Sequence, residues 1–74
     1  MENVNFDYSK LRGRIIEIFG NQKEFAKAMG MSPVSVSLKL CNRSFFNQEE
    51  IQKAVIILGI EPGDVAAYFF TPKL

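Results

Sequence analysis

The chain has 74 residues, of which 47% are hydrophobic and 23% charged, and its formal net charge is +1. This length favours one small domain with a modest core, and the apolar content excludes a disordered chain. Apolar runs such as residues 54–58 are far shorter than the roughly 20 residues that a membrane-spanning helix needs. A single cysteine excludes an internal disulfide, and no basic and apolar leader opens the sequence, so we expect a cytoplasmic protein.

The first predicted helix covers residues 8–19. Its apolar residues share one helical face: Leu11, Ile15, Ile18 and Phe19. Asp7 is expected to cap its first turn, and Phe6 to pack against Leu11 as a hydrophobic staple. Gly13 inside the helix costs about 1 kcal/mol relative to alanine, and a close backbone approach would explain its presence.

The next two helices are predicted at residues 22–29 and 33–41, joined by a tight turn. Asn21 and Glu24 form a capping box for the first of them, and Gly30 ends it in a left-handed conformation. Ser32 and Pro33 then fit the N-cap and first position of the second helix. The turn also carries apolar residues at fixed places: Met31 as a buried plug, and Val36 facing Ala26.

Two more helices complete the chain. Asn47 and Glu50 form a second capping box, with Phe46 and Ile51 as its staple, and predict a helix at 48–58 that ends at Gly59. Pro62 opens a helix at 62–70, which carries the aromatic residues Tyr68, Phe69 and Phe70. Because these local signals agree, we predict an all-α fold, a compact five-helix domain spanning 1–74.

Charge is unevenly distributed along the sequence. Residues 10–43 hold seven basic and two acidic side chains, whereas the rest of the chain holds two basic and six acidic ones. The basic half coincides with the paired helices at 22–29 and 33–41. Such asymmetry predicts a polyanionic partner, although ordinary solvated charge is an open alternative.

The paired helices resemble the lambda-repressor-like helix-turn-helix family, the Cro and repressor type of phage regulators. The resemblance rests on residues in the family spacing: Gln22, Glu24, Phe25, Ala26, Gly30, Met31, Ser32, Val36 and Ser37. The wider sequence is similar to short prophage-encoded regulators, which lack the C-terminal oligomerisation and self-cleavage domain of full-length repressors. The resemblance implies a transcriptional regulator whose helix-turn-helix reads a DNA major groove with the helix at 33–41.

Two positions depart from the family pattern. Lys39 stands where the family usually has an apolar residue, and we expect Leu40 to supply that core contact instead. Asn42 stands where the family favours glycine, and asparagine is the next choice for a left-handed conformation.

Eight residues are candidates for contact with DNA: Gln22, Ser32, Val34, Ser35, Ser37, Leu38, Lys39 and Arg43. Gln22 resembles the family glutamine that bonds a phosphate and braces the reading helix. The serines offer hydroxyls to phosphates or base edges, although Ser32 is first a cap and short hydroxyls are common on solvated faces. Lys39 and Arg43 are placed for backbone phosphates, or for plain surface charge near a helix C-terminus.

Val34 and Leu38 are the most informative of these candidates. They lie four residues apart on the side opposite Val36 and Leu40, where a solvated helix carries polar residues. Such side chains can contact thymine methyl groups. The open alternative is that they pack on another subunit or on the first helix.

Catalysis and cofactors find no support in the sequence. The chain has no histidine, one cysteine at position 41, no glycine-rich phosphate loop and no metal-ligand spacing. We therefore expect no enzyme activity, no cofactor, no metal and no small-molecule ligand.

Double-stranded operator DNA is the partner that the sequence favours. We expect a homodimer on DNA, because one small domain of low charge binds weakly, and the aromatic segment near Tyr68 is a candidate dimer contact. The alternative function is a protein-interaction module, an anti-repressor or docking subunit that keeps the fold without binding DNA.

Overall fold

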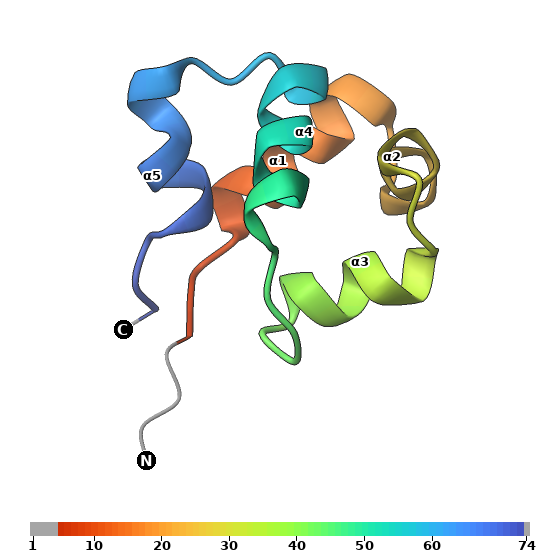
Figure 1. The fold of residues 1–74 in the computed structure, drawn as a ribbon, viewed down its shortest axis with the longest axis horizontal. Helices are drawn as coiled ribbons and strands as arrows, with labels where there is room; N and C mark the ends of the chain where they lie inside the picture. The colour runs from red at the N-terminus through yellow and green to blue at the C-terminus, as the bar shows by residue number, and fades with distance from the viewer. Residues whose placement is uncertain (1–4, 74) are drawn as a thin grey trace.

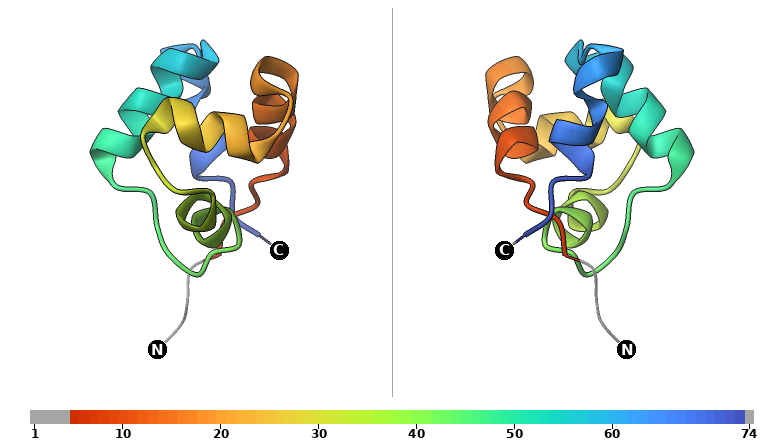
Figure 2. Two further views of the ribbon diagram at one scale, coloured as in Figure 1. Left: turned by 90° about the vertical axis from the view of Figure 1, so that its right-hand side faces the viewer. Right: turned by 90° about the vertical axis from the view of Figure 1, so that its left-hand side faces the viewer.

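The computed structural model describes residues 5–73, which form five α-helices and one short 3-10 helix. The elements are α1 (Ser9–Phe19), α2 (Gln22–Met29), α3 (Pro33–Leu40), α4 (Gln48–Leu58), η1 (Pro62–Asp64) and α5 (Val65–Phe69). The predicted all-α class is confirmed. In Figure 1, α1 and α4 lie at the centre, with α2 and α3 on one side and α5 on the other. Figure 2 shows α3 apart from the other helices at the lower end of the molecule.

Most predicted helix ends have the expected chemistry. Asn47 and Glu50 form a complete capping box, and Ser32 accepts the Ser35 N–H at 3.1 Å. Gly30 and Gly59 are left-handed, with φ of 72° and 64°. The box at Asn21 is only half formed, because its side chain accepts the Glu24 N–H at 2.8 Å without the reciprocal bond. Local capping rules therefore account for α2, α3 and α4.

The first and last helices differ from their predicted ranges. Helix α1 begins at Ser9, and Asp7 Oδ1 accepts both the Ser9 hydroxyl and the Ser9 N–H, which lowers the pKa of Asp7. The predicted helix at 62–70 divides into η1 and α5. Its first turn contains proline and glycine, both poor helix formers, and closes with the tighter bond from the Asp64 N–H to the Glu61 carbonyl at 2.8 Å.

The core combines residues from all five α-helices. Its fully buried members include Leu11, Ile15, Phe25, Ala26, Val36, Ala54, Leu58 and Phe69. The Phe46 ring makes edge contacts with Tyr8 and Phe69, with ring centroids 5.7 and 5.5 Å apart. Two expectations were wrong in degree: Ile18 is 44% exposed, and Met31 is half-buried rather than a buried plug.

A clasp of hydrogen bonds joins both ends of the described chain to the loop after α3. The Asn42 side chain accepts the Phe6 N–H at 2.8 Å and donates to the Phe6 carbonyl at 2.9 Å. On the other side of Phe6, a bridge to Pro72 is held by bonds from Asp7 to Thr71 and from Lys73 to Asn5. Asn42 itself has φ of 64°, as predicted for this position. The Asn42 carboxamide therefore pairs with the N–H and carbonyl of Phe6, as the backbone of a neighbouring strand would.

Gly13 lies on the exposed side of α1, and a Cβ there would meet nothing within 4 Å. The expected close backbone approach is therefore wrong. We predict that Gly13→Ala raises the free energy of unfolding by about 0.5–1 kcal/mol, because alanine loses less backbone entropy. Urea denaturation measures this. The matched change Gly59→Ala should destabilise instead, since φ there is +64°. Equal changes in the free energy of unfolding for the two variants would contradict this difference between a helical glycine and a left-handed one.

Replacing Asn42 separates its backbone role from its side-chain role. Asn42→Gly keeps the left-handed conformation but removes both bonds to Phe6, so we expect a loss of about 1–3 kcal/mol. Asn42→Ala should lose about 1 kcal/mol more, because alanine resists positive φ. Denaturation curves of the two variants test this order. A glycine variant as stable as the parent would show that the clasp contributes nothing.

Candidate interaction surface on helix α3

The turn between α2 and α3 fixes which side of α3 faces outward. The Met31 N–H donates to the Ala26 carbonyl at 2.9 Å, which closes the turn after Gly30. Val36 and Leu40 then pack inward, and Val36 and Ala26 are both fully buried. Because these two anchors are four residues apart on one face, the opposite face of α3 points away from the bundle.

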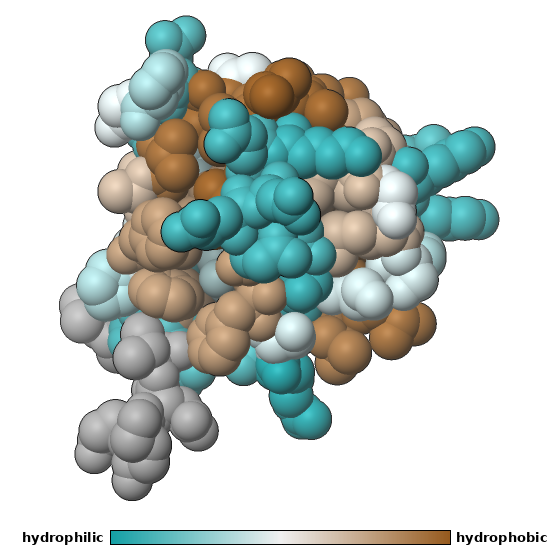
Figure 3. Space-filling view, in the orientation of Figure 1, coloured by the Kyte–Doolittle hydropathy of each residue, from teal (hydrophilic) through white to brown (hydrophobic). Residues whose placement is uncertain are grey.

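The outward side of α3 carries three of the predicted site residues, Val34, Ser37 and Leu38, here called the α3 face. Val34 is 67% exposed and Leu38 is 43% exposed, and Ser37 between them is also exposed. In Figure 3, hydrophobic atoms gather at the lower right edge of the molecule, where Figure 1 draws α3. The alternative that these side chains pack on the domain's own first helix is therefore disfavoured for Val34, most of whose surface is exposed.

The serines at the start of α3 are occupied with one another. Ser32 Oγ accepts the Ser35 N–H and donates to the Ser35 hydroxyl at 3.0 Å. Ser32 is exposed and Ser35 is half-buried. Their first role is therefore to begin the helix, and Ser37 is the serine that lies within the α3 face.

Gln22 and Arg43 lie outside α3. Gln22 is the half-buried first residue of α2, and Arg43 is exposed in the loop that follows α3. The Arg43 N–H donates to the Leu38 carbonyl at 2.9 Å, which ties that loop to the end of α3. Arg43 is thus next to the α3 face.

Lys39 is part of the fold's own hydrogen-bonding network. Its ammonium group donates to the Phe45 carbonyl at 2.9 Å and forms an ion pair with Glu50 at 3.2 Å. The side chain is mostly buried as a result. This joins the end of α3 to the start of α4 and explains a charged residue where the family pattern has an apolar one. Leu40 supplies the core contact, as predicted.

Other basic residues of the 10–43 segment also serve the fold. Arg12 donates to the Leu40 carbonyl at 3.2 Å, and Arg14 donates to the Leu58 carbonyl at 2.8 Å, so each caps the C-terminus of another helix. Lys10 lies over the Tyr68 ring, 5.0 Å from its centroid. With Lys39, four of the seven basic residues of this segment are engaged within the molecule. The charge asymmetry of the sequence is therefore a weaker sign of a polyanionic partner than it looked.

Phe45 is a surface residue that sequence reasoning missed. It is 57% exposed in the loop after α3, and its carbonyl receives the Lys39 ammonium. A signal was present, because Phe46 alone is needed as the staple for α4 and a second adjacent phenylalanine has no such task.

The C-terminal aromatic residues have separate places. Phe69 is buried in the core, and Tyr68 is half-buried beneath Lys10. Phe70 remains exposed, with its ring edge-on to Phe6 at 5.9 Å between centroids. Of residues 68–70, Phe70 alone is exposed, so the predicted dimer contact would depend on that residue.

Within residues 5–73, no group of three or more cysteine, aspartate or glutamate side chains is placed to hold a metal ion. No helix in that part of the chain is long and apolar enough to cross a bilayer.

Comparisons with known proteins give a family and a related structure. Residues 4–72 match the family described as "Protein of unknown function (DUF739)". The chain is similar to the solution structure of the modulator of repression of the temperate bacteriophage TP901-1 from Lactococcus lactis. That similarity has 48% sequence identity, a TM-score of 0.78 and 88% coverage of each chain. No curated protein sequence matches the chain.

These comparisons bear on the predicted resemblance. They bear out a similarity to a phage regulatory protein, whereas neither names the lambda-repressor-like family, so that assignment stays a prediction. Because the family match covers nearly the whole sequence, the chain belongs to the DUF739 family.

Proposed function

We propose that the protein regulates transcriptional repression in a phage-type genetic switch by binding a repressor protein through the α3 face. The proposal rests on one observation. Val34 and Leu38 are exposed on the outer side of α3. The basic side chains of Lys39 and Arg12 near this helix are bonded to other groups of the protein. This choice reverses the order that the sequence favoured. The alternative function, a protein-interaction module, becomes the first candidate.

The chemistry of the α3 face favours a protein over DNA. Burying a valine or leucine side chain gains about 1.5–3 kcal/mol, and the gain comes in full only against another apolar surface. The buried centre of a protein interface is depleted of charged residues, and the exposed side chains of Val34 and Leu38 fit such a centre. Phe45 in the adjoining loop adds a third large apolar side chain to this end of the molecule.

The related phage protein supports the regulatory setting. It is a modulator of repression, and it shares the fold and nearly half of the residues in the aligned region. A protein that modulates repression without an enzyme site most simply acts by binding the repressor. We likewise propose no catalytic activity for this chain, because it contains no histidine and only one cysteine.

Sequence-specific DNA binding is the second candidate. It is supported by the α2–turn–α3 arrangement, by Gln22 at the start of α2 and by the exposed Arg43 and Ser37 beside Leu38. Lys23 and Lys27 on α2 are exposed as well and are in no ion pair within residues 5–73. These residues would supply phosphate contacts if α3 entered a major groove.

Substitutions of the apolar residues of the α3 face test the proposed protein interface. Val34→Asp and Leu38→Asp should each weaken binding to a purified repressor from the same genome by at least about tenfold, because an unpaired carboxylate becomes buried. Isothermal titration calorimetry measures the affinity. The matched control is Ile18→Asp on α1, since Ile18 is 44% exposed and Leu38 is 43% exposed. Loss of affinity in all three variants, or in none, would contradict the proposal.

The salt dependence of DNA binding distinguishes a protein partner from a DNA partner. We expect the wild-type protein to bind genomic duplex fragments weakly, with a shallow dependence on salt between about 50 and 200 mM, because few cations are available. Fluorescence anisotropy measures this, with Arg43→Ala as the test variant and Lys39→Gln as a comparison. Tight binding with a steep salt slope that Arg43→Ala reduces would favour DNA and overturn the order proposed here.

A further inference from the structure

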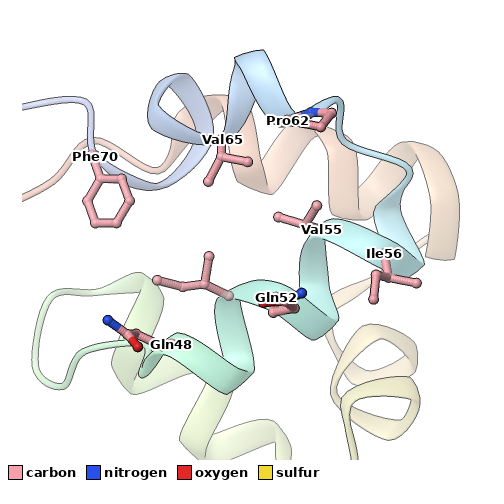
Figure 4. Close-up of a pocket in the computed structure, with 8 residues that line it drawn as sticks. Gln48, Gln52, Val55, Ile56, Pro62, Val65 and Phe70 are labelled. Atoms are coloured by element: carbon pink, nitrogen blue, oxygen red, sulfur yellow. The ribbon is translucent and has the colours of Figure 1, made fainter.

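A second apolar surface lies between α4 and α5, away from the α3 face. It is a groove of about 480 Å³. Its apolar lining comes from Ile51, Val55 and Ile56 of α4 and from Pro62, Val65 and Phe70 across from them. Figure 4 shows Val65 and Phe70 on one wall and Val55 and Gln52 on the other. In Figure 3 the corresponding region, over the upper part of the molecule, is a hydrophobic patch separate from the one over α3.

The groove is not needed to complete the core. Ile56 is 71% exposed, more than Val34, and Phe70 at the opposite end of the groove is exposed too. The proposed function uses neither residue. An apolar groove flanked by two exposed large hydrophobic side chains is a candidate second binding site.

The charges beside the groove are acidic. Glu61 and Asp64 are exposed next to the lining residues Pro62 and Val65, and Glu49 is exposed next to Gln48. Within the described residues, none of the three carboxylates is in an ion pair. The nearest lysine on α4, Lys53, has its ammonium group against Gly30, 3.8 Å from where a Cβ would be, so it is directed toward α2.

We propose that this groove binds an amphipathic helix of a partner protein, with apolar side chains on one face and lysine or arginine along its edges. The α4 wall has 11 residues and is therefore about 16 Å long, which matches three turns of a docked helix. Apolar residues spaced at i, i+3 or i+4, and i+7 would enter the groove. Basic residues at its edges would meet Glu61, Asp64 and Glu49, and the Gln48 and Gln52 amides line the rim.

Charge complementarity selects this occupant over two others. A second copy of this chain would bring an equally acidic rim, with no cation among the lining residues to pair with it, so that contact is disfavoured. An anionic lipid surface is disfavoured for the same reason. A basic helix satisfies both the apolar floor and the acidic edges.

Two matched synthetic peptides of about 14 residues test this inference. Both carry leucine at i, i+3, i+4 and i+7; one has lysine and the other glutamate at the remaining positions. We expect the lysine peptide to bind the full chain at least about tenfold more tightly. In 15N-labelled protein, the amide signals of Gln52, Val55 and Val65 should shift, and those of Val34 and Leu38 should not.

Two variants assign the binding to the groove. Ile56→Lys should weaken the lysine peptide at least about tenfold, while Ile16→Lys, an exposed isoleucine on α1 outside the groove, should change affinity less than about twofold. The double variant Glu61→Lys/Asp64→Lys should reverse the preference between the peptides. Circular dichroism confirms that each variant is folded.

Four results would overturn the inference. These are equal affinity for the two peptides, no binding of either, shifts confined to the α3 face, and concentration-dependent shifts of groove residues in the free protein. The last result would identify a second copy as the occupant. The outcome is independent of the α3 proposal, because Val34→Asp leaves the groove intact.

Discussion

The orientation of α3 depends on a small number of buried contacts. The helix has eight residues, and only Val36 and Leu40 anchor it in the core. Two anchors on one face define which side points inward but resist rotation poorly. Three polar ties near its C-terminus supply the rest: Lys39 to Glu50, Arg12 to the Leu40 carbonyl, and Asn42 to Phe6. The α3 face is therefore presented by a short helix that is fixed mainly at one end.

Contacts of this kind limit what the electrostatic pattern of the sequence indicates. A cluster of basic residues near a candidate reading helix normally predicts a polyanionic partner. Here Arg12 and Arg14 cap the C-termini of α3 and α4, where the helix dipole and unpaired carbonyls favour a cation. Lys39 is paired with Glu50. The hydrogen-bond donors that Arg12 and Arg14 use at these helix ends are occupied within the protein, although both guanidinium groups keep their charge.

The molecule has two apolar surfaces that differ in their surroundings. The α3 face lies near serines and the exposed Arg43, whereas the groove between α4 and α5 lies near carboxylates. Because the charges beside the two surfaces differ in sign, the α3 face and the groove suit partners of different chemistry. They are therefore two separate surfaces.

Local rules predicted the helices well because helix ends are decided within a few residues. The capping box at Asn47 and Glu50, the left-handed Gly30 and Gly59, and the Ser32 N-cap each involve groups no more than five residues apart. The prediction for residues 62–70 failed for an equally local reason. The proline and glycine of the first turn weaken the α-helix whose start the local pattern predicted. The outward direction of Val34 and Leu38 followed from helical periodicity and the positions of Val36 and Leu40.

The sequence by itself determined the number of helices, most of their ends and the apolar side of α3, since these follow from short-range hydrogen bonding and periodicity. Only the tertiary structure decided which polar residues bond to distant parts of the chain. Asn42 reaches Phe6 across 36 positions, Arg12 reaches Leu40 across 28, and Arg14 reaches Leu58 across 44. The groove between α4 and α5 likewise exists only once the two helices are packed. A side chain's partner depends on which distant backbone groups are left unpaired beside it, and that is settled by the packing of the helices.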